Sequence, residues 1–126
     1  MDRVKGKVAI VTGSGSGLGR AEAVMLAKEG AKVAVTDIND ANGAETVEII
    51  RAAGGEAEYW HLNASVEKEC ADVLEKVVEK FGKLDILVNN AGITGPDVPT
   101  EEVEETDWDK MFAINVKSVL FMTKHA

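Results

Sequence analysis

The sequence predicts an α/β protein with a doubly wound parallel sheet and helices on both of its faces, in three layers (α/β/α). Four segments have the pattern of strands, and they are apolar almost throughout, as expected for strands covered on both faces. Segments rich in helix formers alternate with these strands, and the connections between them are short. Each strand–helix–strand crossover is then expected to be right-handed, and the length of 126 residues predicts one domain.

The first predicted unit is a strand, a helix and a second strand within about thirty residues. Its two strands, residues 7–12 and 32–37, are rich in β-branched side chains. Between them, residues 18–29 are mostly good helix formers, and Gly30 supplies a C-terminal stop. The side chains expected to share one face of this helix are Leu18, Ala21 and Met25.

A second helix and a third strand follow this unit. Asn39 or Asp40 can cap a helix that runs to Ala53, where a pair of glycines ends it. The third strand is expected at residues 57–62. The side chains spaced for one face of the second helix are Ala44, Val47 and Ile50.

A third helix and a fourth strand complete the predicted sheet. Ser65 is expected to cap the helix, whose acidic first turn suits the helix dipole, and Gly82 ends it. The fourth strand, residues 84–88, is interrupted only by Asp85, and turn-prone residues 89–92 follow it. The amphipathic stripe of the helix consists of Val66, Cys70, Val73, Val77 and Phe81.

A last helix is expected at the end of the chain. Thr106, followed three residues later by Asp109, resembles a capping box that opens a helix running to Ala126. The acidic cluster within residues 101–105 indicates a solvated surface before this helix. The side chains expected on one face are Trp108, Met111, Phe112, Asn115, Val119 and Met122.

Composition and charge exclude several classes of function. Fourteen basic against 22 acidic residues give a net charge of −8, which repels phosphate backbones and anionic lipids, so neither nucleic acid nor a membrane is expected as a partner. Cys70 is the single cysteine, and His61 and His125 are far apart, so neither a disulfide nor a metal site is expected. No apolar run is long enough for a membrane span or a signal peptide, which favours the cytoplasm.

A glycine-rich turn lies where the first predicted strand gives way to the first helix. The unsatisfied N–H groups of a helix start can bind an anion there, and glycines allow the backbone to approach a pyrophosphate closely. The literal G-x-G-x-x-G spacing fails, because its third glycine position holds Leu18 or Arg20. The wider spacing T-G-x-x-x-G-x-G fits, with Thr12, Gly13, Gly17 and Gly19. A merely flexible turn is the alternative, but a strand before the turn and a helix after it favour a dinucleotide site.

Asp37 is expected at the carboxyl end of the second strand, beside the crevice where a doubly wound sheet binds its ligand. A carboxylate there accepts hydrogen bonds from the two hydroxyls of an adenosine ribose and repels a 2′-phosphate. The glycine turn itself contains no cation, since Ser14 and Ser16 fill the positions where one would neutralise that phosphate. NAD is therefore favoured over NADP, and an ordinary strand-end acid is the alternative interpretation of Asp37.

Taken together, these features resemble the short-chain dehydrogenase/reductase family. The glycine turn, Asp37, the segment Asn89-Asn90-Ala91-Gly92 and Asn115 occur in the order and context that this family shows. The resemblance covers essentially the whole chain. It implies a Rossmann-type doubly wound parallel sheet with strand order 3-2-1-4 in residues 1–126.

The resemblance also implies roles for single residues. The turn glycines would shape the pyrophosphate site, Asp37 would hold the adenosine ribose, and Asn63 with Ala64 would lie at the adenine. The family commonly has aspartate where this chain has Asn63, and an amide still offers an acceptor and a donor. The segment after the fourth strand would flank the nicotinamide half. The complete expected cofactor set is Thr12, Gly13, Ser16, Gly17, Leu18, Gly19, Asp37, Ile38, Asn63, Ala64, Asn89, Ala91 and Gly92.

Asn115 lies on the apolar side of the last predicted helix, where a buried amide needs hydrogen-bond partners. The residues alone indicate an amide that pins two elements together. The resemblance implies one of four catalytic residues, which anchors a water leading to a catalytic lysine. The two roles are compatible.

The family's other catalytic groups, a serine and a Tyr-x-x-x-Lys segment, follow the helix on which this chain ends. The single tyrosine here, Tyr59, falls within the third predicted strand. Residues 84–88 would also form an unpaired apolar edge, which natural proteins avoid. We therefore expect residues 1–126 to be the NAD-binding N-terminal half of one domain that continues past Ala126, able to bind cofactor but not to catalyse alone.

The resemblance implies an NAD-dependent oxidoreductase that interconverts a secondary alcohol and a ketone by hydride transfer. A 3-oxoacyl-thioester reductase using NADP is one alternative, against which Asp37 and Ser16 argue. A non-catalytic dinucleotide-binding or interaction module is another. The expected partners are a small alcohol or ketone and further copies of the chain, in a dimer or tetramer formed partly through the helix that begins near Thr106.

Overall fold

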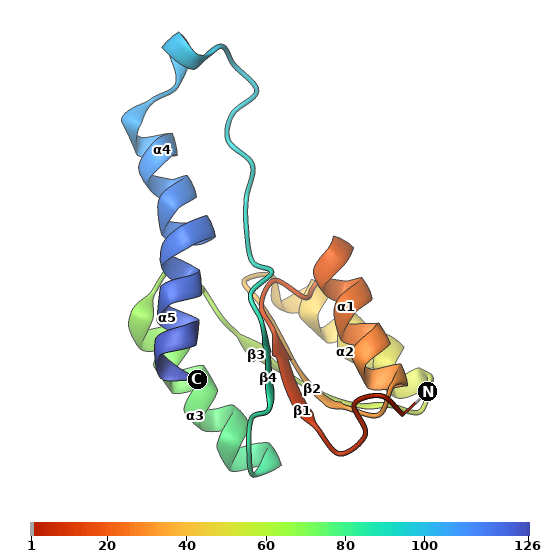
Figure 1. Ribbon diagram of the computed structural model, residues 1–126. Coiled ribbons are helices and arrows are strands. Elements are labelled where there is room, and N and C mark those ends of the chain that lie inside the picture. The colour runs from red at the N-terminus through yellow and green to blue at the C-terminus, as the bar shows by residue number, and fades with distance from the viewer. Residues whose placement is uncertain (1) are drawn as a thin grey trace.

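The computed structural model describes residues 2–126 and contains a four-stranded parallel sheet in the order β3-β2-β1-β4, with helices on both faces (Figure 1). This confirms the predicted doubly wound α/β fold and its strand order. The elements of the sheet and its crossovers are β1 (Val8–Val11), α1 (Gly17–Lys28), β2 (Lys32–Asp37), α2 (Asp40–Ala52), β3 (Glu56–His61), α3 (Glu67–Phe81) and β4 (Ile86–Val88).

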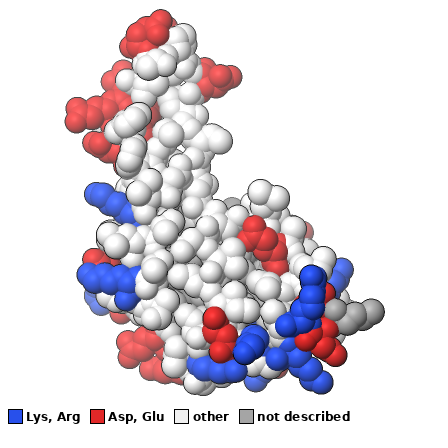
Figure 2. Space-filling model, viewed as in Figure 1, with Lys and Arg blue, Asp and Glu red and all other residues white. Residues whose placement is uncertain are grey.

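The predicted last helix is divided into three helical segments that form an arm beside the sheet (Figure 1). None of the residues of α4 is buried, and acidic side chains gather at the outer end of the arm (Figure 2). On the predicted apolar face only Met122 is fully buried, whereas Trp108 is 54% exposed. The segments after β4 are the short 3₁₀ helix η1 (Thr100–Glu102), α4 (Glu105–Phe112), the π-helical turn η2 (Ala113–Lys117) and α5 (Ser118–His125).

The central strand β1 pairs in parallel with β2 on one side and with β4 on the other. Ala9 is opposite Val33 in β2 and Ile86 in β4. Successive side chains of a strand point to opposite faces, so β1 contributes to two separate layers of core. Every residue of β1 is buried, which agrees with its continuous apolar sequence.

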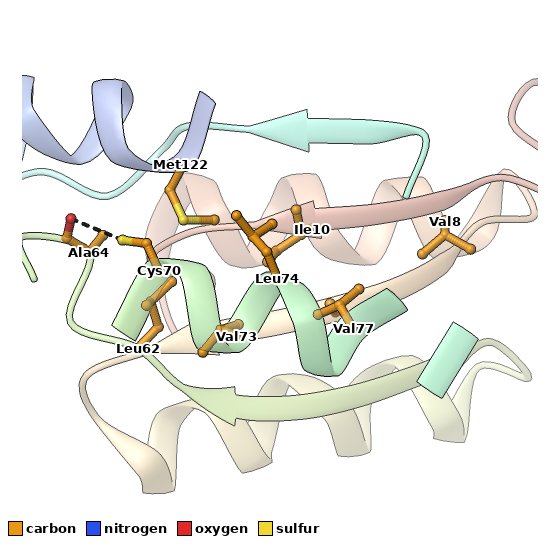
Figure 3. Packing of buried hydrophobic residues seen from close by; sticks show 10 residues of the cluster. Val8, Ile10, Leu62, Ala64, Cys70, Val73, Leu74, Val77 and Met122 are labelled. Carbon is orange, nitrogen blue, oxygen red and sulfur yellow. Dashed lines mark hydrogen bonds between the residues drawn. The ribbon is translucent and has the colours of Figure 1, made fainter. Parts of the chain in front are cut away.

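The two faces of the sheet hold two hydrophobic clusters. Between the sheet and helices α3 and α5, Ile10 packs with Leu74, Val77 and Met122 (Figure 3). The thiol of Cys70 is buried in this cluster and donates to the Ala64 carbonyl at 3.4 Å. The cluster on the other face is covered by α1 and α2 and includes Ala9, Val11, Ala23, Ala27, Val33, Val35, Val47 and Ile50.

The packed face of the first helix is not the face that carries Leu18, Ala21 and Met25. Leu18 and Met25 are 77% and 52% exposed, and the buried residues of α1 are Gly19, Ala23 and Ala27. Residues four apart lie on one face of a helix, and small side chains on that face let α1 lie close to its neighbours. Apolarity alone therefore does not identify the packed side of this helix.

The second helix shows the same effect in part. Val47 and Ile50 are buried as predicted, but Ala44 is exposed and Gly43 is buried instead. A Cβ atom at Gly43 would lie 2.0 Å from the Tyr59 ring. The aromatic ring of β3 thus occupies the space that a larger helix residue would need.

Two of the predicted helix ends are confirmed and two are wrong. Asn39 caps α2, because its side chain accepts from the Asn42 N–H, and Gly82 ends α3 in the left-handed conformation (φ 86°). Ser65 does not cap α3: Val66 occupies that position without a side-chain bond. The capping box at residues 106–109 was also wrong, since α4 begins at 105 and its cap residue makes no side-chain bond.

The charged residue inside the predicted fourth strand has a structural role. The Asp85 carboxylate accepts the Val8 N–H at 2.9 Å, and the Asp85 N–H donates to the Val8 carbonyl at 2.9 Å. The bond from Val8 and the nearby Lys83 ammonium lower the pKa of Asp85. The strand itself begins at Ile86, two residues after the predicted start.

Among residues 2–126 no helix is long and apolar enough to cross a bilayer.

Candidate functional site

A pocket of about 430 Å³ opens at the carboxyl ends of the strands, where the strand order reverses around β1. It brings together all the predicted cofactor residues except Gly17 and Asn89. Leu62, Asn90, Ile93 and Ile114 also line it, and none of these was predicted. The predicted lining residues are Thr12, Gly13, Ser16, Leu18, Gly19, Asp37, Ile38, Asn63, Ala64, Ala91 and Gly92.

The glycine turn contributes several residues to the lining of this pocket. Gly13 and Gly17 have φ values of 64° and 55°, a conformation that side chains disfavour. A Cβ atom at Gly19 would lie 2.2 Å from the Gly13 carbonyl oxygen and 2.4 Å from the Asn90 side-chain nitrogen. Glycine is therefore required at Gly13 and Gly17 because of their backbone conformation, and at Gly19 because a side chain there would clash.

The start of α1 faces the pocket through Ser16, Leu18 and Gly19. Ser16 is the cap residue and makes no side-chain bond to the helix, and the first turn contains no acidic residue. The N–H groups and positive dipole of this turn are thus left to a ligand. Their chemistry fits the pyrophosphate of a dinucleotide.

Buried hydroxyl groups hold the turn against the sheet. The Ser14 hydroxyl donates to the Val11 carbonyl at 2.8 Å and accepts the Thr36 N–H at 3.0 Å. The Thr36 hydroxyl donates to the same Val11 carbonyl at 2.9 Å. The turn is consequently joined to both β1 and β2 by groups that water does not reach.

Asp37 ends β2 at the rim of the pocket, as predicted. The Gly15 N–H donates to its Oδ2 at 2.8 Å, and the Asn39 N–H donates to its Oδ1 at 2.9 Å. Both oxygens are therefore oriented by the backbone, and each retains a lone pair for a ligand. A pair of hydroxyls on one sugar ring matches this arrangement.

Tyr59 lies behind Asp37 and outside the pocket lining. Its hydroxyl donates to the Asp37 carbonyl at 2.8 Å and lies 2.5 Å from Asp40 Oδ1. Burial, together with this carboxylate, raises the pKa of Tyr59. His61 shares the same Asp40 oxygen at 2.8 Å. This tyrosine serves the packing of α2 against β3.

Asn63 and Ala64 lie on the side of the pocket formed by the end of β3. The Asn63 side-chain oxygen accepts from the Ser65 N–H at 3.1 Å and from the Ser65 hydroxyl at 2.6 Å. A carboxylate could accept the same bonds, so the amide keeps the local contacts of the aspartate that the resemblance leads us to expect here. Burial raises the pKa of the nearby Cys70 thiol to about 11.

The segment after β4 is fastened to the glycine turn by Asn90, which was not in the predicted set. Its side-chain nitrogen donates to the carbonyls of Thr12 and Gly13, each at 3.1 Å. The N–H groups of Asn90 and Ala91 both donate to the Thr12 hydroxyl at 3.0 Å. Thr12 is thus occupied by protein contacts, and Asn89 points away, toward the Thr123 hydroxyl at 3.4 Å.

Asn115 pins the loop after β4 to the arm, as the residues alone indicated. Its oxygen accepts the Ile93 N–H at 2.7 Å, and its nitrogen donates to the Ile93 carbonyl at 2.8 Å. It lies inside the π-helical turn η2, where the Ser118 hydroxyl also donates to the Ile114 carbonyl. Such turns are frequent at functional sites, and the catalytic role of Asn115 stays a prediction.

Comparison with known proteins relates this geometry to a family. The model of the family described as short chain dehydrogenase matches residues 7–126. The chain is 49% identical to an uncharacterized oxidoreductase of Thermotoga maritima and 40% identical to a 3beta-hydroxysteroid dehydrogenase of Mediterraneibacter gnavus. These matches cover 97% and 96% of the chain but 47% and 44% of the relatives.

A solved structure of NAD⁺-bound xylitol dehydrogenase superposes with a TM-score of 0.94 at 32% identity, over 98% of this chain and 47% of that one. The chain thus spans about half the length of the proteins that it matches. The pocket lies where the motifs predicted it. Because the family model covers nearly all of the chain, the chain belongs to the short-chain dehydrogenase family.

Proposed function

We propose that residues 1–126 form the cofactor-binding N-terminal half of an NAD-dependent oxidoreductase domain that interconverts a secondary alcohol and a ketone. The observation that carries this proposal is the Asp37 carboxylate, which faces the pocket rim with both oxygens held by backbone N–H groups. A small alcohol or ketone is the proposed substrate class.

The pocket residues supply binding and orientation. The uncapped start of α1 would hold the pyrophosphate, Asp37 the adenosine ribose, and the end of β3 the adenine. Ala91 and Gly92 would flank the nicotinamide side. When bound, NAD supplies the hydride acceptor or donor of the reaction.

Charge supports NAD over NADP. A 2′-phosphate would meet the Asp37 carboxylate, and like charges at this distance disfavour binding. Arg20 is the nearest cation of the turn segment, and its guanidinium contacts the Gly15 carbonyl at 2.6 Å and the Glu45 carboxylate at 3.4 Å. That cation is therefore already neutralised by protein groups. The likeness to an NAD⁺-bound dehydrogenase supports the same choice.

Asn115 is the proposed catalytic contribution of this half, through a water that leads to a lysine of the other half. The π-helical turn around it supports this role, because the turn interrupts the regular hydrogen bonding of the arm. The serine, tyrosine and lysine of the reaction would come from the remainder of the protein. We also propose that the protein is a homo-oligomer, since the arm formed by α4, η2 and α5 exposes Trp108, Phe112, Val116 and Leu120.

Titration of the complete protein with NADH and NADPH, followed by cofactor fluorescence, tests the proposal. We expect tighter binding of NADH, and a rise of about tenfold in its Kd when Asp37→Ala removes the ribose hydrogen bonds. Asp72→Ala, an exposed acid on α3, is the matched control and should leave both constants unchanged. Tighter binding of NADPH, or equal effects of the two variants, would contradict the assignment.

A further inference from the structure

We propose that Arg20 and Thr46 are positioning residues that set the discrimination between NAD and NADP, although neither lines the pocket. They hold the peptide group between Ser14 and Gly15, and this peptide in turn orients the Asp37 carboxylate. The inference rests on the proposed function, because it assigns to these residues a part in the recognition of the adenosine ribose.

One peptide group joins Thr46 to Asp37. The Thr46 side chain is fully buried, and its hydroxyl donates to the Ser14 carbonyl at 2.9 Å. The N–H at the other end of that same peptide belongs to Gly15 and donates to Asp37 Oδ2 at 2.8 Å. A peptide is planar, so a bond that fixes its carbonyl also fixes the direction of its N–H.

Arg20 determines how the Thr46 hydroxyl is used. Its Nε–H donates to Thr46 Oγ1 at 2.9 Å, which occupies that oxygen as an acceptor. The hydroxyl hydrogen is then free for the carbonyl of Ser14, which is closer than the carbonyl of Asn42 (2.9 against 3.2 Å). Arg20 Nη2 also donates to the Gly15 carbonyl at 2.6 Å. The two peptides that flank Gly15 are therefore both held by this pair of side chains.

The contact between the turn and Asp37 leaves little room for another arrangement. A Cβ atom at Gly15 would lie 2.7 Å from Asp37 Oδ2 and 3.0 Å from the Asn42 Cβ. Rotation of the Ser14–Gly15 peptide would turn its carbonyl oxygen toward the carboxylate and force the two apart. The hydrogen bonds from Thr46 and Arg20 oppose that rotation.

We call the chain of hydrogen bonds from Arg20 and Thr46 through the Ser14–Gly15 peptide to Asp37 the relay. Its loss affects the binding of the two cofactors differently. An Asp37 carboxylate that leaves its orientation loses hydrogen bonds to the free 2′,3′-diol of the adenosine ribose, which only NADH offers. The same movement reduces the repulsion of a 2′-phosphate. Damage to the glycine turn as a whole would instead weaken both cofactors, because both share the pyrophosphate.

The test measures the Kd of NADH and of NADPH by fluorescence titration of the complete protein. Thr46→Val removes the hydroxyl at nearly constant volume, and Thr46→Ser keeps the hydroxyl as the conservative variant. Thr46→Val should raise the Kd of NADH about two- to tenfold, the value of one hydrogen bond, and leave that of NADPH unchanged or lower. Thr46→Ser should retain the wild-type ratio.

A double-mutant cycle with Asp37→Ala separates the relay from a general effect on folding. In that background Thr46→Val should no longer change the ratio of the two constants. Arg20→Met, which keeps the aliphatic stem, provides the same measurement if the valine variant does not fold. An equal rise for both cofactors, or an undiminished effect without Asp37, would overturn the relay. If the wild-type protein binds neither cofactor, the proposed function itself fails; if it binds NADH and the variants keep its ratio, only the relay fails.

Discussion

The glycine turn and the α4–α5 arm differ in how firmly the chain holds them. At the turn, the buried hydroxyls of Thr12, Ser14, Thr36 and Thr46 all make hydrogen bonds, and they connect the turn with β1, β2, α2, β4 and the segment after β4. In the arm, α4 buries no residue. The arm is joined to the segment after β4 by the pair of bonds between Asn115 and Ile93 and by the longer bond between Asn89 and Thr123.

This difference separates two parts of the site. The adenosine and pyrophosphate side is fixed by many short bonds, so its geometry is already set within residues 2–92. The side toward Ile93 and Ile114 depends on where the arm lies. Changes at the turn should therefore be costly and affect the entire pocket, whereas changes in the arm should be milder and local.

The largest expected effect is that of Gly19→Ala. The new methyl group would meet the Gly13 carbonyl and the Asn90 amide, and displacing them should cost about 3 kcal/mol or more in the free energy of unfolding. NADH binding should be lost as well. Gly6→Ala is the control for the conformational cost alone, since Gly6 has a φ of 77° and no atom within 4 Å of an added Cβ, and it should cost about 1 kcal/mol. Urea unfolding of both variants gives the comparison, and equal costs would contradict the steric explanation.

Asn90→Ala should have the next largest effect. It leaves the carbonyls of Thr12 and Gly13 without their donor, at a cost of about 2 kcal/mol. Asn89→Ala, at the neighbouring exposed position, should change the free energy of unfolding by less than about 0.5 kcal/mol. Chemical denaturation measures both, and a larger effect at Asn89 would reverse the assignment.

In the arm, Asn115→Ala should cost about 1 kcal/mol, because the amide pair is partly solvated. The change should be local: the Ile93 N–H loses its acceptor and exchanges faster with solvent deuterium. Amide exchange measured by NMR tests this, with Lys117→Ala on the same turn as the control. Faster exchange throughout the glycine turn would show that the two regions are more tightly coupled than their contacts indicate.

The smallest expected effect is on how the free energy of unfolding depends on pH in the acid range. The pKa of Asp85 is lowered in the folded protein, chiefly by the Val8 N–H and then by Lys83. The stabilisation from this group is complete above the ordinary carboxyl pKa and disappears as the pH falls through the lowered value. Asp85→Asn should remove this part of the acid dependence of unfolding. Denaturation at a series of pH values measures this. If the free energy of unfolding of Asp85→Asn falls at acid pH just as it does in the wild type, the assignment is contradicted.

Much of the fold and of the site could be predicted from the sequence. Continuous apolar strands, the spacing of the glycines and the acid at the end of β2 depend on local chemistry that a single sequence displays. The failures came from contacts between distant segments. The face of α1 is chosen by the closeness of its neighbours, so Ala23 and Ala27 are buried rather than Leu18.

Asn90 illustrates the same limit inside the site. Its partners, the carbonyls of Thr12 and Gly13, are remote in sequence and meet it only because β1 and β4 are adjacent. A signal was nevertheless present, since alternate residues after a strand point to opposite sides, and only one of two successive asparagines could face β1. Asp85, which interrupts an apolar strand, carried a similar signal.

The pairing of β1 with β4 has a consequence for the order in which the chain folds. Val8 and Asp85 are 77 residues apart, whereas β1, β2 and β3 follow one another with a single helix between each pair. Contacts between distant residues form late because a long loop must first close. The ribose side of the pocket should therefore assemble before Asn90 forms its hydrogen bonds to the glycine turn. Pulse-labelled hydrogen exchange would show this as protection of the Gly15 amide before that of Ala91, and simultaneous protection would argue for a single concerted step.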